Sequence, residues 1–422
     1  MAASRGFFLN LANTRYLRMN GAIGRHFRPS ILRCAYKTAF FISSSHHSHT
    51  VFTSNIRAHI IENPKHDHNT RTFSGTQPAI PIPPPPVYQP PKTGFISHLP
   101  HSWIPYAELI RLDKSTGTYY LFFPCLFSAL MAASYTASPP IPVLTTSLLF
   151  FTGALIMRGA GCTINDLWDR NLDPHVARTR LRPIARGAVT PFQAVTFTGF
   201  QLLAGLGILL QFPTSCLYYG IPSLLLVATY PLAKRVTDYP QFILGLTFSW
   251  GAVMGFPALG IDTLAEPSAA KAVAALYASC VSWTVLYDMI YAHMDIKDDA
   301  KAGIKSISLR HEHETKRVLS GLAVLQVVLL AVAGIASGAG PIFFVGGCGS
   351  AAATLGLMIW RVKLKEVGNC WWWFRNGAWL TGGGIAAGLL GDYLVRINQV
   401  ELKNSEELLE NRGEAYRIEL KR

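Results

Sequence analysis

Charged side chains are scarce in this sequence of 422 residues. Asp, Glu, Lys and Arg make up 15% of it and hydrophobic residues 50%, whereas an ordinary soluble domain carries about 25% charged residues. A soluble enzyme is therefore disfavoured. The net charge is +14, but a nucleic-acid-binding protein needs its basic residues on a folded polar surface. Because most of this chain is apolar, we exclude a nucleic-acid partner.

Acidic residues are absent from the first 61 positions, which contain eight Lys and Arg residues. This composition is typical of a mitochondrial transit peptide, and a disordered basic tail is the alternative. No continuous apolar core with a cleavage site is present, so a secretory signal is disfavoured. Residues 62–97 are rich in proline, including the run 83–86, and are predicted to form an extended linker.

Paired cysteines are also lacking. The seven cysteines are dispersed and none forms a C-x-x-C pair, so neither a disulfide framework nor a zinc site is indicated.

Three long stretches contain no charged residue at all: 115–157, 187–233 and 318–360. A membrane helix needs about 20 residues, so each stretch has room for two crossings. Each also contains Pro or Gly near its middle, where a turn is expected. Further apolar stretches at 240–260, 268–291 and 377–394 bring the prediction to nine transmembrane helices. We therefore expect an all-α integral membrane protein, with a helical domain over residues 98–396 and a charged tail over 397–422.

Basic residues test this topology, because they collect in loops on one side of a membrane. The loops after the second, fourth, sixth and eighth predicted spans contain 18 Lys and Arg residues, within 158–186, 234–235, 297–317 and 361–375. The loops on the opposite side contain essentially none, and Lys271 is the only one nearby. For a protein imported into mitochondria, this face is predicted to be the matrix face of the inner membrane.

Two rows of carboxylates lie on the same predicted face. Asn165, Asp169 and Asp173 are spaced by four residues and share one side if the helix continues through them. Asp288, Asp295 and Asp299 share a face by the same periodicity. Carboxylates stacked in this way repel one another, so a cation is expected between them. Oxygen ligands of this kind suit Mg²⁺, which is commonly held by one or two carboxylates together with substrate phosphates.

Cations flank both rows and would contact the remaining phosphate oxygens; they are Arg158, Arg178, Arg182, Lys234, Arg235 and Lys305. The pattern predicts a metal–diphosphate site for a lipid diphosphate at the membrane boundary. The alternative is that these are solvated loop charges that only set the topology. A transporter with an ion path is disfavoured, because its carboxylates would lie at mid-membrane rather than at span ends.

The residues that carry these patterns resemble the two signature motifs of the UbiA superfamily of intramembrane prenyltransferases. The first is Asn165-Asp166-x-x-Asp169-x-x-x-Asp173, followed by Arg178 and Arg182; the second runs from Asp288 through Tyr291, Asp295 and Asp299 to Lys305. Within that superfamily, residues 106–118 and 230–235 resemble the branch that acts on 4-hydroxybenzoate in ubiquinone biosynthesis. The resemblance covers about residues 98–396.

The resemblance implies a helix bundle around a central cavity open to membrane lipid. It also implies transfer of a polyprenyl chain from polyprenyl diphosphate to the ring carbon ortho to the hydroxyl of 4-hydroxybenzoate. Asp169, Asp173, Asp295 and Asp299 would be the catalytic carboxylates, and they would bind diphosphate through Mg²⁺ with Asn165 and Asp288. Tyr291 would contact substrate.

Several points stay open at this stage. Arg111 and Lys114 are expected either to hold the benzoate carboxylate or to lie at the membrane interface. Met294 and Ile296 replace polar residues usual in the second motif, which bears on substrate choice. Prenylation of another aromatic acid in secondary metabolism is the alternative activity. Association with other proteins of ubiquinone biosynthesis is a further expectation.

Overall fold

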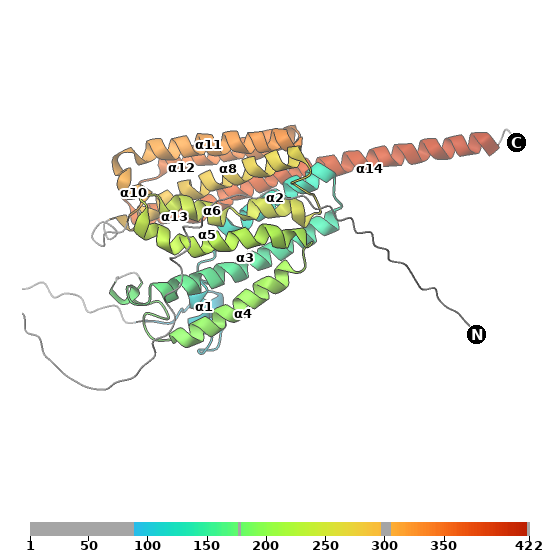
Figure 1. The fold of residues 1–422 in the computed structure, drawn as a ribbon. Coiled ribbons are helices and arrows are strands. Elements are labelled where there is room, and N and C mark those ends of the chain that lie inside the picture. The colour runs from blue at the N-terminus through green and yellow to red at the C-terminus, as the bar shows by residue number, and fades with distance from the viewer. Residues whose placement is uncertain (1–87, 176–178, 297–304, 420–422) are drawn as a thin grey trace, which may run out of the picture. The chain divides into compact units, whose positions relative to one another are not determined.

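The computed structural model describes residues 88–175, 179–296 and 305–419, and the predicted transit peptide lies outside them. Every regular element in this part of the chain is a helix, and the long helices run side by side as a bundle (Figure 1). An all-α architecture is confirmed.

The main helices follow the chain in order: α2 (Thr116–Thr136), α3 (Pro140–Trp168), α4 (Pro191–Leu209), α5 (Ser215–Val236), α6 (Pro240–Phe248), α7 (Gly251–Ala258), α8 (Pro267–Ala292), α11 (Thr315–Ser337), α12 (Gly349–Arg361), α13 (Val367–Gly377) and α14 (Gly384–Glu419). Two helices are short, α1 (Ile104–Leu109) and α10 (Ile307–Arg310). The π-helical segments η4 (Phe343–Cys348) and η5 (Ala378–Gly383) precede α12 and α14. Short 3₁₀ turns are η1 (Phe95–His98), η2 (Asp173–His175) and η3 (Glu312–Glu314).

Each of the nine predicted spans contains helix, and six helices in the described part of the chain are long and apolar enough to cross a membrane. Nine crossings therefore remain a prediction. Proline at the first helical position explains several of the observed starts, including those of α3, α4 and α8, because its fixed φ suits the first turn and the backbone N–H that it lacks has no partner there.

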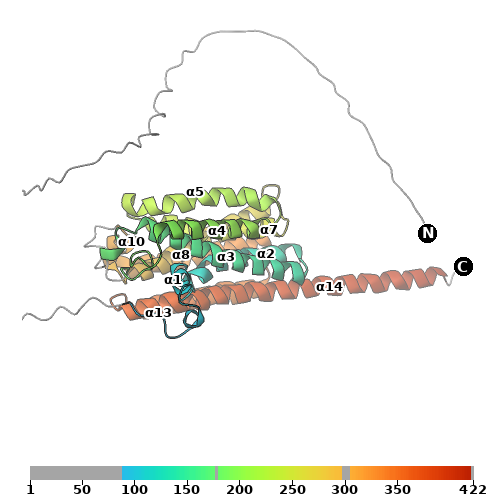
Figure 2. The same cartoon turned by 90° about the horizontal axis from the view of Figure 1, so that it is seen from below.

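The core lies on one side of the bundle. Its largest cluster surrounds Trp283 of α8 with Tyr120 and Phe127 of α2, and it extends to α11, α12 and α14. In the 18-residue apolar stretches of α8 and α2, 78% and 72% are buried inside the protein, whereas only 17% of the corresponding stretch of α4 is buried. Helix α4 thus presents an apolar surface outward, as expected for a helix that faces lipid (Figure 2).

The charged loops gather at one end of the bundle. Arg310, after α8, pairs with Asp238, after α5, at 3.2 Å, and Lys316 at the start of α11 donates to the carbonyl of Trp360 near the end of α12. The C-terminal ends of α3 and α8 lie at this same end (Figure 1). The arrangement agrees with the predicted alternation of spans.

The opposite end holds the base of a long helical extension. Arg396 of α14 donates to the carbonyl of Gly338, which ends α11, at 2.8 Å. Helix α14 then continues past the bundle, and residues 398–411 are exposed along their whole length (Figure 2). The predicted tail is thus helical as far as Glu419.

Candidate functional site

The first carboxylate row does not lie along one continuous helix. Helix α3 ends at Trp168, Asp169 caps it, and Asp173 begins the short turn η2. Asn165 and Asp169 do lie one turn apart, and the Asp169 backbone N–H donates to the Asn165 carbonyl. The helix therefore does not continue through all three residues, which was the condition for the shared face. After α3 ends, the Asp173 backbone N–H still donates to the Asp169 carbonyl, and Asp173 is the first residue of a 3₁₀ turn that includes Pro174.

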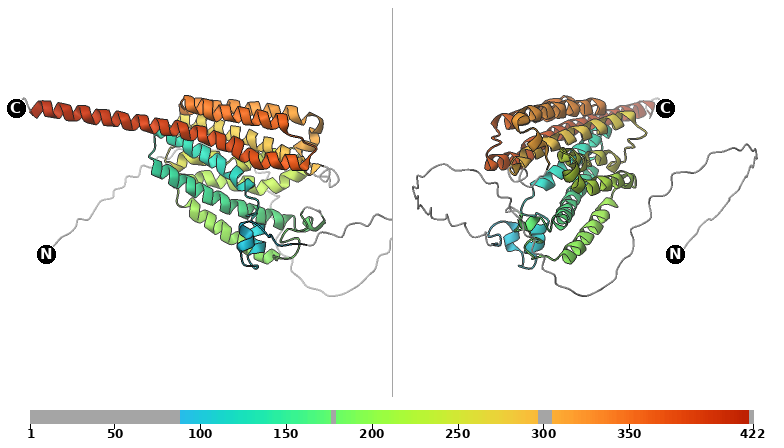
Figure 3. Two further views of the ribbon diagram at one scale, coloured as in Figure 1. Left: turned by 180° about the vertical axis from the view of Figure 1, so that it is seen from behind. Right: turned by 60° about the vertical axis from the view of Figure 1, so that its left-hand side comes forward.

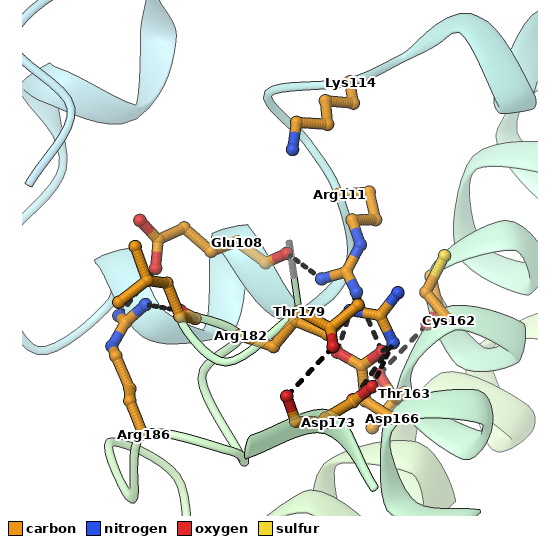
Figure 4. Close-up of polar contacts among 12 residues, drawn as sticks. Glu108, Arg111, Lys114, Cys162, Thr163, Asp166, Asp173, Thr179, Arg182 and Arg186 are labelled. Carbon is orange, nitrogen blue, oxygen red and sulfur yellow. Dashed lines mark hydrogen bonds and ion pairs between the residues drawn. The ribbon is translucent and has the colours of Figure 1, made fainter. Parts of the chain in front are cut away.

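Asp166 is the centre of the charged contacts at this end of α3. It is 1% exposed, and Arg111 Nη2 lies 2.8 Å from each of its carboxylate oxygens. Arg182 Nη1 lies 3.1 Å from Asp166 Oδ1 (Figure 4). One buried carboxylate is thus neutralised by two guanidinium groups from different segments.

Arg182 also holds Asp173. Its Nη1 donates to both carboxylate oxygens of Asp173, at 3.2 and 3.0 Å. The Thr179 hydroxyl donates to the Asp173 carbonyl and fixes the backbone of the turn (Figure 4). In this structure the carboxylate of Asp173 is therefore an ion-pair partner of Arg182.

A second ion pair lies beside the first. Arg186 Nη2 lies 2.6 Å from Glu108 Oε2, and Tyr88 donates its hydroxyl to Glu108 Oε1 at 2.8 Å. The Arg186 guanidinium lies over the Tyr88 ring, 3.6 Å from its centroid. Burial and the Glu108 carboxylate raise the pKa of Tyr88, so the hydroxyl remains a donor at neutral pH.

Arg111 reaches Asp166 from an unusual backbone. Its φ is +57°, in the left-handed region, which costs a non-glycine residue energy. Its Nη1 donates to the Glu108 carbonyl at 2.9 Å. These contacts hold the Arg111 guanidinium against α3. Both roles left open for this residue stay predictions; in this structure its side chain is paired with Asp166 and is 17% exposed.

Arg158 lies on α3 and faces α2. Its Nε is buried and has no hydrogen-bond partner among the described residues, while its Nη1 contacts the Cys162 sulfur. A Cβ at Gly117 would overlap the Arg158 guanidinium. Glycine at position 117 therefore provides the space that this side chain occupies.

The second carboxylate row also departs from one helix. Asp288 lies in the last turns of α8, whereas Asp295 follows the helix end and its backbone N–H donates to the Ala292 carbonyl. Tyr291 packs on Phe374, with ring centroids 4.6 Å apart. Asp299 lies outside the described residues.

The other predicted cations occupy varied positions. Lys114 is exposed, with Nζ 3.9 Å from Asp113. Lys305 is half exposed and its Nζ lies 3.8 Å from Asp238. Lys234 and Arg235 lie in the last turn of α5, and Arg178 lies outside the described residues.

The donor chemistry suits a hard divalent cation. Carboxylate and amide oxygens at the ends of α3 and α8 (Asn165, Asp169, Asp288 and Asp295) are ligands that Mg²⁺ prefers. No group of three or more His, Cys, Asp or Glu side chains gathered for a metal occurs in the part of the chain that the structure describes. A cation that completes its shell with water and substrate phosphates fits such a sparse set.

Sequence reasoning missed four residues of this site: Asp166 as a buried ion-pair centre, and Tyr88, Glu108 and Arg186. Asp166 stands inside the first motif, but its partner Arg111 is 55 positions away; Glu108 and Arg186 are 78 apart. The spacing of residues within a motif does not predict ion pairs between residues so far apart in the sequence.

Known proteins share both the sequence and the fold. Residues 121–381 match the model of the UbiA prenyltransferase family. The mitochondrial 4-hydroxybenzoate polyprenyltransferase of Schizosaccharomyces pombe is 47% identical over 70% of this chain and 81% of its own. Its counterpart in Saccharomyces cerevisiae is 46% identical over 72% of this chain and 80% of its own.

A solved structure has the same fold. The apo structure of a UbiA homolog from Aeropyrum pernix K1 matches with a TM-score of 0.54 at 23% identity, over 64% of this chain and 97% of that one. With most of its helical bundle matched by the family model, this chain belongs to the UbiA prenyltransferase family.

Proposed function

We propose that this protein transfers a polyprenyl chain from polyprenyl diphosphate to 4-hydroxybenzoate, a membrane step of ubiquinone biosynthesis. The allylic C–O bond breaks, a C–C bond forms at the ring carbon ortho to the hydroxyl, a ring proton is lost and diphosphate leaves. The observation that carries the proposal is the identity of 46–47% to relatives with that name, over about four fifths of their length.

The diphosphate group of the substrate would bind at the charged end of the bundle. Asn165, Asp169 and Asp295 would hold Mg²⁺, together with Asp173, Asp288 and Asp299. The metal would supply positive charge that favours departure of the diphosphate. Arg178, Arg182, Lys234, Arg235 and Lys305 would bind the remaining oxygens.

The sequence placed the benzoate carboxylate at Arg111 and Lys114, and Arg158 among the diphosphate cations. Because Arg111 is paired with Asp166 and Lys114 is exposed, we place the aromatic acid beside Arg158 instead. Its guanidinium is held between α3 and α2, and its buried Nε has no partner among the described residues. A benzoate carboxylate would accept from such a group, since an unpaired buried donor is costly. Aromatic side chains nearby, including the stacked rings of Tyr120 and Tyr287, would keep water from the reacting carbon.

We also propose that the protein resides in the mitochondrial inner membrane, with its charged end toward the matrix and with the prenyl tail in contact with membrane lipid. The basic composition of residues 1–61 supports import. Deleting residues 1–61 should abolish mitochondrial localisation, as fluorescence microscopy of a C-terminal fusion would reveal. Mitochondrial localisation of the deleted form would contradict this. Association with other ubiquinone-biosynthesis proteins belongs to the same proposal.

An assay on membranes tests the activity. Polyprenyl diphosphate, radiolabelled 4-hydroxybenzoate and Mg²⁺ should yield a labelled lipid with the wild-type protein, and EDTA should abolish it. Asp169→Ala and Asp295→Ala should each lower the rate at least about 100-fold, the scale of losing one charge-stabilising group. Full activity in either variant would contradict the mechanism, and product with another aromatic acid only would favour the alternative substrate.

A further inference from the structure

We propose that residues 88–113, here called the strap, hold residues 179–189 in the shape that binds the polyprenyl diphosphate, with Glu108 and Arg186 as positioning residues. The strap precedes the region that the family model matches. The inference rests on the proposed function, because it assigns these residues a part in binding that substrate.

Apolar packing forms the first attachment. Leu109 of α1 is fully buried, and it lies in one cluster with Ile184 and Val189, which are 8% and 1% exposed. Tyr106 packs against the same cluster and against Phe197 of α4, with ring centroids 5.1 Å apart. Helix α1 therefore lies beside the α3 and α4 ends (Figure 3).

The ion pair of Glu108 with Arg186 forms the second attachment. Both oxygens of Glu108 are used, one by Arg186 and one by Tyr88. Arg186 Nη1 donates to the Leu181 carbonyl at 2.7 Å. The two side chains of the pair are 13% and 14% exposed, so this contact is shielded from solvent more than a surface ion pair. The strap thereby fixes both the side chain and the local backbone of the segment.

Arg111, near the end of the strap, connects it to the charged residues of the site. Arg111 and Arg182 share Asp166, and Arg182 also binds Asp173. If the strap moves, Arg111 leaves Asp166 and the position of Arg182 changes. Glu108 and Arg186 touch neither Asp166 nor Asp173 in any contact that the structure describes, so they act through Arg111 and the 179–189 backbone.

A charge-exchange experiment tests the strap in the full-length protein. Glu108→Gln should raise the KM for polyprenyl diphosphate about tenfold, leaving kcat and the KM for 4-hydroxybenzoate within about twofold. The double variant Glu108→Arg with Arg186→Glu should restore most of the lost affinity, which simple loss of packing would not allow. The matched control is Glu366→Gln, which breaks an exposed pair with Lys363 at the same end of the bundle; its KM should equal that of wild type.

Limited trypsin digestion gives a readout without catalysis. In detergent micelles, Glu108→Gln should increase cleavage after Arg180 about fivefold by peptide mass spectrometry, and the double variant, which keeps Arg180, should reverse the increase. If Glu108→Gln folds poorly, Tyr88→Phe removes only the hydroxyl donor and should give a smaller change in the same direction.

The outcomes separate the two proposals. If no form transfers a prenyl chain but the digestion pattern changes as expected, the proposed function fails and the strap stands. An unchanged KM and unchanged digestion in Glu108→Gln would overturn the strap, whatever the activity. A raised KM that the double variant leaves unrestored would also overturn it.

Discussion

The side chain of Asp166 faces two guanidinium groups, those of Arg111 and Arg182, and is almost completely buried. Removal of one partner from a buried ion pair is costly because the remaining charges lose their compensation. Asp166 is therefore expected to matter for folding as well as for the position of both arginines.

Asp166→Asn keeps the shape of the side chain and removes its charge. We expect it to destabilise the protein by about 3 kcal/mol, the lower part of the range for breaking a buried pair, because both arginines keep some solvent exposure. Thermal unfolding of the detergent-solubilised protein measures it. Asp238→Asn is the control, since Asp238 pairs with Lys305 and Arg310 at an exposed site and should cost about 0–1 kcal/mol. Equal shifts in both variants would contradict the burial argument.

Gly117→Ala tests the place of Arg158. The added methyl group would displace the Arg158 guanidinium, so the KM for 4-hydroxybenzoate should rise about tenfold, the equivalent of one charged hydrogen bond. The KM for polyprenyl diphosphate should stay unchanged in steady-state assays. Gly161→Ala, where a Cβ meets nothing within 4 Å, is the matched control. A rise in the diphosphate KM instead would argue against Arg158 as the carboxylate ligand.

At the level of single residues, sequence reasoning named most of the motif but not its contacts. Asn165 and Asp169 were predicted one turn apart and lie so, because a helix fixes that spacing. Asp173 was expected on the same face only if the helix continued, and it lies in the turn η2 because α3 ends at Trp168. The ion pairs of Asp166 and Glu108 depend on the tertiary approach of the strap, which no local pattern encodes.

Among the elements, α14 joins two environments in one helix. Its first part packs in the bundle, where Asp392 accepts from Ser134 at 3.0 Å and Tyr393 donates to the Ser138 carbonyl at 2.8 Å. Beyond Ile397, which is 8% exposed, its described side chains make no buried contact. The part of α14 that packs in the bundle therefore ends at Ile397, although the helix itself continues to Glu419.

Truncation of α14 should show this boundary. A chain that stops after Asn398 should change the stability by no more than about 0.5 kcal/mol, as for surface changes. A chain that stops after Leu390 loses Asp392, Tyr393 and Ile397 and should yield little monodisperse protein. Size-exclusion chromatography and thermal unfolding in detergent compare the two. Equal damage in both would mean that the exposed part contributes to folding.

The helical elements themselves were largely predictable. Proline and glycine at the turns marked where the apolar stretches divide, and each stretch contains helix. The break between α6 and α7 near Ser249 and the π-helical segments were not predicted, because neither hydropathy nor turn residues distinguish them from continuous helix. The helical form of the tail was left open, since its charge pattern suits either state.

The helical bundle within the described residues has its charged loops at one end. Helix α14 extends from the opposite end (Figure 3). Alternation of apolar stretches with basic loops was sufficient to predict this polarity. The number of membrane crossings was harder to predict. Apolar helices such as α6 and α7 are each shorter than the roughly 20 residues that a crossing needs, so their length does not show whether they cross.

If the charged end faces the matrix, the tail faces the other side. Trypsin added to mitoplasts, in which the outer membrane is open, should remove a C-terminal epitope by cleavage after exposed Lys403. Fragments from the basic loops should appear only after the inner membrane is dissolved. Protection of the epitope in intact mitoplasts, with cleavage in the loops, would reverse the assigned orientation.

The ion-pair network has a consequence for how the protein responds to salt. Glu108, Asp166 and Asp173 balance Arg111, Arg182 and Arg186 in charge, at exposures of 20% or less. Mobile ions screen partly buried pairs far less than surface pairs. The carboxylates near Asp173 are therefore neutralised by neighbouring arginines of the same chain. We expect these ion pairs to persist at ionic strengths that break the exposed pairs of Lys363 and Arg317.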